Sequence, residues 1–184
     1  MSDQTDFAGA YQAVGEYFCA FSELDRELGE AVKVVLGLTN HPARDLIVAA
    51  LEDPARKARL ILAGVAVAKN ADDSEASAEW KKSAEKTVNK ALGHNGNTRA
   101  ALAHSYLEPQ VDGSVRVTRL NLRDRQSTGE PKPENLEAKI KEAREITEQL
   151  QKITAELSEL KIPIPDMSWF ARLSEPATLP LRHG

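Results

Sequence analysis

The chain has 184 residues, of which 41% are hydrophobic, 5% aromatic and 28% charged, and its formal net charge is −4. This length favours one domain with a mainly aliphatic core. The acidic balance argues against a protein that holds nucleic acid through bulk positive charge.

The single cysteine and the absence of long apolar runs indicate a protein of a reducing compartment. Cys19 has no second cysteine to pair with inside the chain. No apolar run approaches the ~20 residues of a membrane helix, and the first residues lack a signal-peptide pattern. We therefore expect a cytoplasmic protein without a membrane segment.

Residues 6–36 are predicted to form one long helix. Gly15 and Gly29 each cost ~1 kcal/mol relative to alanine in a helix, so both predict the close approach of another element. Cys19 lies on the apolar stripe, which predicts a buried thiol. The stripe has spacings of three and four and consists of Val14, Phe18, Phe21, Leu24, Leu28, Val32 and Val35.

Two further helices are predicted over residues 42–51 and 54–69. Asp53 is the expected N-cap of the second, with Pro54 in its first turn. Lys57, near its beginning, allows two interpretations, contact with a phosphate or a place on a solvated face, and the solvated face is the commoner one.

A fourth helix is predicted over residues 78–92, before the run G-H-N-G-N. The two glycines predict a break at residues 93–97, after which Asn97 caps a short helix over residues 98–104. The alternative is one bent helix that absorbs the interruption. In the first interpretation His94 is an ordinary loop residue.

Residues 106–122 are predicted to form a small β-hairpin with its turn at residues 112–113. Pro109 confines the first arm to an edge or a bulge. A β-bulge near Thr118 or Arg119 would bring four hydrophobic residues of the second arm to one face. Residues 126–133 are predicted to be a loop. The four hydrophobic residues are Val115, Val117, Leu120 and Leu122.

Residues 134–160 carry the longest helical pattern, which fits a core-facing helix better than a short coiled-coil seam. Prolines then exclude regular helix, and Trp169 and Phe170 are too apolar for a free tail. We therefore predict an all-α, up-down helical bundle over residues 1–161, with the hairpin inserted before the long last helix. The extended segment 162–184 is expected to pack on the body or on a second subunit.

The candidate chemistry lies in residues 97–106, N-T-R-A-A-L-A-H-S-Y. Arg99 is long enough to reach the same site as His104, which lies near a helix end. The structural alternative is that Arg99 pairs with an acid of the first helix and His104 caps a helix C-terminus. The four histidines have no metal-ligand spacing, and neither a metal nor a cofactor is expected.

Three stretches resemble small bacterial HEPN-like proteins (higher eukaryotes and prokaryotes nucleotide-binding). They are F-S-E-L-D-R-E-L at residues 21–28, A-R-K-A-R-L-I-L at residues 55–62 and T-R-A-A-L-A-H-S-Y at residues 98–106. The family signature is an arginine, four to six residues and a histidine, late in an all-helical bundle; here a hairpin and a long helix follow. The resemblance covers residues 18–160.

The resemblance implies a homodimer in which the two motifs form one composite site, and a metal-independent endoribonuclease activity. His104 would transfer protons to and from RNA oxygens, and Arg99 would hold the phosphate. Candidate substrate-binding residues are Lys57, Tyr106, Arg116 and Arg119, of which the two arginines belong to the most basic segment of the chain.

The sequence also departs from the pattern of the nuclease members. They commonly place a polar residue directly after the motif arginine, where this chain has Ala100. The superfamily also contains inactive binding and dimerisation modules. The alternative function is therefore a non-catalytic dimerisation or interaction protein, with a protein partner, of the kind found in defence or toxin–antitoxin systems.

Overall fold

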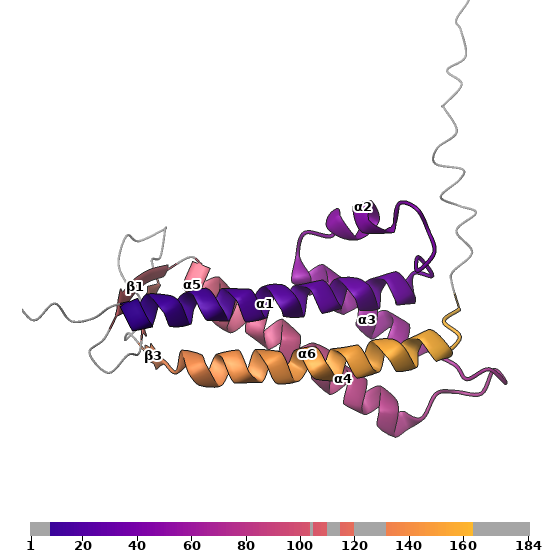
Figure 1. Cartoon of the computed structure of the whole chain (residues 1–184). Helices are drawn as coiled ribbons and strands as arrows, with labels where there is room; N and C mark the ends of the chain where they lie inside the picture. The colour runs from indigo at the N-terminus through magenta and orange to yellow at the C-terminus, as the bar shows by residue number, and fades with distance from the viewer. Residues whose placement is uncertain (1–7, 104, 110–114, 120–131, 164–184) are drawn as a thin grey trace, which may run out of the picture.

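The protein is described by a computed structural model that covers residues 8–103, 105–109, 115–119 and 132–163. It confirms the predicted all-α helical bundle, with a small sheet at one end (Figure 1). Trp169 and Phe170 lie outside the described residues. The main helices are α1 (Ala8–Val35), α3 (Pro54–Val67), α4 (Ala78–Gly93) and α6 (Leu136–Glu159).

The order of the helices follows from one return connection. Residues 36–53, which include the short α2 (Arg44–Ala49), carry the chain back along α1, so that α3 runs in the same direction as α1 (Figure 1). From α3 through α4 to α6 the helices alternate in direction, and α6 lies beside α1.

The core lies between the inward faces of these helices, where burial of aliphatic side chains stabilises the bundle. Tyr17 and Ala20 are buried near the N-terminal half of α1, whereas Cys19 is exposed. The prediction of a buried Cys19 thiol is therefore wrong, because the buried stripe lies one residue away from it. Fully buried aliphatic residues include Leu24, Leu28, Val32, Ile61, Val65, Val88, Ile146, Leu150 and Leu157.

The two glycines of α1 differ in their surroundings. A Cβ on Gly29 would lie 3.1 Å from a γ carbon of Val48, so the predicted close approach, here by α2, is confirmed. Among the described residues a Cβ on Gly15 would meet nothing within 4 Å, so the predicted close approach is not observed there for Gly15.

The N-caps fix where two helices begin. The Asp53 side chain accepts a hydrogen bond from the Ala55 amide at 2.9 Å, with Pro54 in the first turn, as predicted. Asn135 caps α6 by accepting from the Ala138 amide at 3.0 Å. Each cap satisfies a backbone donor that the first turn of a helix leaves unpaired.

The predicted break at residues 93–97 is wrong. α4 continues without interruption into a π-helical turn, η1 (His94–Arg99), and then into α5 (Ala100–Ala103). The two glycines are tolerated because His94 and Thr98 are buried and hold the turn in place. The alternative prediction, that one helix absorbs the interruption, is the correct one.

The predicted hairpin is confirmed as β1 (Ser105–Pro109) and β2 (Val115–Arg119), which pair antiparallel. The register is regular over all five pairs, so no bulge occurs in β2, and β1 is an edge strand, as Pro109 predicts. β3 (Lys132–Glu134) pairs with the other side of β2, so the predicted loop is wrong at residues 132–133, and the last helix begins at Leu136 and not at residue 134. Residues 126–131 of the predicted loop lie outside the described residues. The predicted turn, Leu120 and Leu122 lie outside the described residues.

Candidate functional site at the π-helical turn

The π-helical turn η1 places polar residues inside the bundle at the end of α4. His94 and Thr98 are buried, and Arg99, the last residue of the turn, is half-buried. A π-helix bonds each residue to the one five positions away. His94 and Thr98, four residues apart, lie on the same side of the turn, as their burial shows, and Arg99 follows Thr98 directly.

His94 contacts α1 through Tyr17. The two rings are stacked, with centroids 6.2 Å apart and an interplanar angle of 19°. The Tyr17 hydroxyl lies 3.4 Å from His94 Nδ1 and 3.4 Å from the His94 carbonyl oxygen, to which it can donate. Tyr17 is fully buried and His94 is 4% exposed, so this contact belongs to the core.

The other side of the His94 ring faces α6. Nε2 lies 3.3 Å from a Glu142 carboxylate oxygen, which also lies 3.1 Å from Lys139 Nζ. The angles at Nε2 do not make a hydrogen bond, and this buried nitrogen has no hydrogen-bond partner among the described residues. An unsatisfied buried polar atom costs ~1–3 kcal/mol.

The charge state of His94 follows from this environment. Burial lowers the pKa of His94 from its ordinary value of 6.5, and this effect outweighs the nearby Glu142 charge. For Glu142, burial alone would raise the pKa, but Lys139 and His94 together lower it. At neutral pH we therefore expect a neutral imidazole beside an ionised carboxylate.

Arg99 makes no ion pair within the part of the chain that the structure describes. Three carboxylates of α1 pair elsewhere: Asp25 with Lys57, Glu27 with Arg26 and Glu30 with Lys33. The alternative in which Arg99 pairs with an acid of the first helix is thus not observed among the described residues. His104 lies outside them, so its approach to Arg99 stays a prediction.

The predicted substrate-binding residues are not all at one place. Lys57 is 7% exposed, and its Nζ donates to both Asp25 carboxylate oxygens at 2.9 Å, so its assignment to a solvated face is wrong. Arg116 is exposed on β2, in the sheet that adjoins α5. Tyr106 belongs to β1 and Arg119 to β2, and the structure describes the backbone of these two residues only.

The sequence analysis missed the buried cluster of Tyr17, His94 and Glu142. The available signal was helical spacing: His94 follows Ala91 by three residues and continues the buried stripe of Ala84, Val88 and Ala91. The neighbouring Gly93 and Gly96 favour a loop instead, and the loop prediction for His94 rests on them. Periodicity thus carried more information here than residue type.

No group of three or more His, Cys, Asp or Glu side chains among the described residues is arranged to hold a metal ion. Within the same residues, no helix has the length and apolar character needed to cross a membrane.

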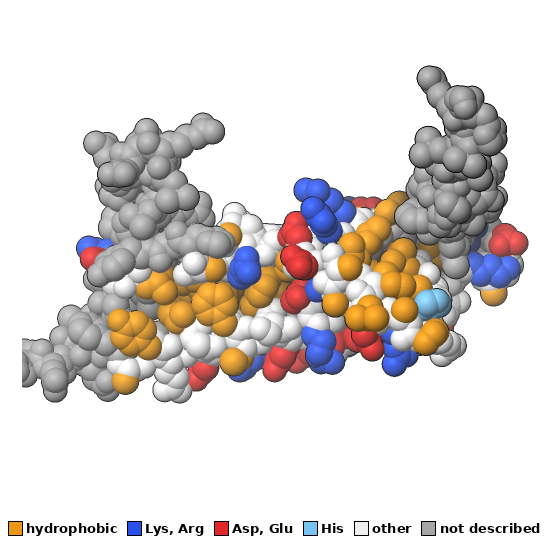
Figure 2. Space-filling view, turned by 90° about the horizontal axis from the view of Figure 1, so that it is seen from above, with side chains coloured by type: hydrophobic (Ala, Val, Ile, Leu, Met, Phe, Trp, Pro, Cys, Tyr) orange, Lys and Arg blue, Asp and Glu red, His pale blue; other side chains and the backbone are white. Residues whose placement is uncertain are grey.

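On the face that carries α1 and α2, hydrophobic side chains gather toward both ends, with charged side chains between them (Figure 2). Tyr11 of α1 is 60% exposed, and Leu46 and Ile47 of α2 are 76% and 37% exposed. Leu46 and Ile47 are consecutive residues of one short helix, and exposed apolar side chains that lie together are typical of contact surfaces.

Comparisons with protein-family models, with characterised proteins and with solved structures gave no match to this chain. The resemblance to HEPN-like proteins therefore stays a prediction from the sequence motifs and the order of the elements.

Proposed function

We propose that the protein is a HEPN-like homodimer that binds and cleaves RNA without a metal, at a composite site made from Arg99 and His104 of both subunits. The observation that carries the proposal is Arg99 itself. It is half-buried at the end of a π-helical turn and makes no ion pair among the described residues. A guanidinium in that position can bind an anion.

The π-helical turn supports a functional role for this end of α4. Such turns are rare and occur frequently at functional sites. Here the turn buries His94, with Nε2 3.3 Å from a Glu142 carboxylate oxygen of α6. The buried contacts of His94 and Thr98 hold the backbone next to Arg99, and a fixed backbone limits the positions open to the guanidinium.

The chemistry of the proposal assigns one role to each motif residue. Arg99 binds the phosphate through its planar set of donors and stabilises the charge that develops during the reaction. His104 accepts the proton of the RNA 2′-hydroxyl, which attacks the phosphate, or protonates the leaving oxygen. His94 is buried against Tyr17 and Glu142, so it positions the turn and does not reach the substrate.

The test is cleavage and binding of a fluorescent single-stranded RNA in EDTA. Wild type should cleave the RNA and leave DNA of the same sequence intact, because DNA lacks the 2′-hydroxyl. R99A should lose binding and cleavage, and H104A should lose cleavage while it keeps binding. R56A is the matched control, since Arg56 is an exposed arginine of α3. Equal activity in wild type, R99A and H104A, or no RNA binding by wild type, would remove the proposal.

The alternative is a non-catalytic interaction protein of a defence or toxin–antitoxin system. The exposed Leu46 and Ile47 of α2, with Tyr11 of α1, favour it. In that case Arg99 is structural, and R99A should lower the midpoint of thermal unfolding. An unchanged midpoint together with lost RNA binding would support the nuclease proposal instead.

A further inference from the structure

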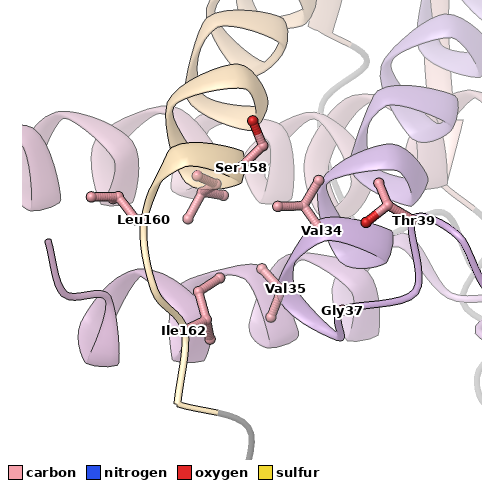
Figure 3. A pocket seen from close by; sticks show the side chains of 8 residues that line it. Val34, Val35, Gly37, Thr39, Ser158, Leu160 and Ile162 are labelled. Carbon is pink, nitrogen blue, oxygen red and sulfur yellow. The ribbon is translucent and has the colours of Figure 1, made fainter. Parts of the chain in front are cut away.

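A pocket lined by aliphatic side chains and by polar groups lies between the last turns of α1 and α6 and the segment that follows α6 (Figure 3). Its volume is about 200 Å³. Val34 and Val35 line it from α1, Leu157 and Ser158 from α6, and Ile162 closes it from the segment after the helix. The remaining lining residues are Gly37, Thr39 and Leu160.

A second, basic pocket lies on the other side of Ile162. It is lined by Lys69, Lys161 and Asp73, together with Ile162 and Pro163. The backbones of Lys69 and Lys161 bond to each other at 2.9 and 2.8 Å, which holds the two segments side by side. Lys161 Nζ lies 3.4 Å from a carboxylate oxygen of Asp73, so the lining carries two ammonium groups and one carboxylate.

The chain continues beyond these pockets in the sequence. Residues 164–184 follow Pro163, and they begin I-P-D-M-S-W-F. At ~3.1 Å per residue for an extended, proline-rich chain, the backbone can span about 12 Å from Ile162 to Asp166 and about 22 Å from Ile162 to Trp169. Both pockets are therefore within reach of this segment without any further element.

We propose that the segment of residues 166–170 docks back onto this end of the bundle, with Trp169 in the pocket between α1 and α6 and Asp166 at the two lysines. The aliphatic side chains of the lining match the aromatic ring, its polar groups can accept the indole N–H, and the two ammonium groups match the carboxylate. Trp residues that fill well-packed pockets contribute most to contacts of this kind.

Docking of the chain's own segment is favoured over docking of a second copy, because the segment is covalently attached close to the pockets. A short tether holds its attached group at an effective concentration in the millimolar range, which a free second copy does not reach at micromolar protein. Pro163 and Pro165 further restrict the tether, so that less conformational freedom is lost on docking.

The experiment uses the full chain with Trp169 as its only tryptophan. W80F gives this background, because Trp80 is the other tryptophan; it is half-exposed and its indole nitrogen donates to Glu156 at 2.7 Å. Trp169 emission should be blue-shifted, and acrylamide should quench it at least ~3-fold more slowly than a free tryptophan, because a docked indole is shielded from water. Neither value should change over a 100-fold dilution.

Substitutions in the pocket then locate the docking site. V34E should shift Trp169 emission to that of an exposed indole, and S158E at the exposed rim should do the same if V34E fails to fold. L46E, on the exposed leucine of α2, is the matched control and should change nothing. The proposal is overturned by an exposed Trp169 in the W80F protein, by shielding that S158E and V34E leave intact, or by shielding that dilution abolishes.

Discussion

Gly64 of α3 packs directly against Val35 of α1, and its replacement by alanine tests this packing. A Cβ at position 64 would lie 2.7 Å from each γ carbon of Val35 and 3.3 Å from its Cβ. Val35 is 7% exposed and β-branched, so no single rotation of its side chain removes both clashes. Overpacking of this kind costs ~1–3 kcal/mol, against a gain of ~1 kcal/mol from the better helix former.

We therefore expect G64A to lower the free energy of unfolding by up to ~2 kcal/mol. For a protein of this size that corresponds to a decrease of up to ~8 °C in the midpoint of thermal unfolding. G15A is the matched control, because a Cβ there meets no described residue within 4 Å, and it should stabilise the protein by up to ~1 kcal/mol. The assay is urea unfolding followed by circular dichroism, with V35A and the double variant completing the cycle. Equal effects of G64A and G15A, or additive effects of G64A and V35A, would refute the packing argument.

Three further predictions concern single contacts. D53A should lower the free energy of unfolding by ~1 kcal/mol in urea, because the cap of α3 is lost; no change would show that the cap is not needed. K57A should lower it by ~1–3 kcal/mol, since Asp25 loses two hydrogen bonds to a buried partner, and a neutral result would contradict the ion pair. Burial lowers the pKa of His94, so the unfolded chain binds more protons below pH 6.5, and stability falls as pH falls from there toward the lower pKa of the folded state. Thermal melts between pH 7.5 and 5 should show a smaller loss for H94Q than for wild type, and parallel curves would refute the assignment.

Much of the bundle could be predicted from residue spacing. The stripes of α1 and α6 place hydrophobic residues at intervals of three and four, and burial of that stripe is what stabilises each helix. The pair Asp53–Pro54 marked the beginning of α3, because the cap and the proline both suit a first turn. These features are local, so one sequence is enough to predict them.

The site was harder to predict because it depends on contacts between distant residues. The π-helical turn at His94–Arg99 contains two glycines that favour a break, and burial against Tyr17 and Glu142 overrides that local preference. Lys57 is likewise buried only because Asp25 lies opposite it on another helix. Neither partner is indicated by local spacing.

The central claim is that the Arg99–His104 motifs of two subunits lie close together in a dimer. Disulfide cross-linking of the A103C variant between two subunits tests this claim most directly. Ala103 is the exposed last residue of α5, directly before His104, and C19S removes the native thiol. The proposal predicts that mild oxidation of C19S/A103C gives a disulfide-linked dimer, because a disulfide requires Cα atoms within ~7 Å. The control C19S/L46C should stay unlinked. A monomeric A103C protein, with dimers formed through L46C instead, would contradict the composite site.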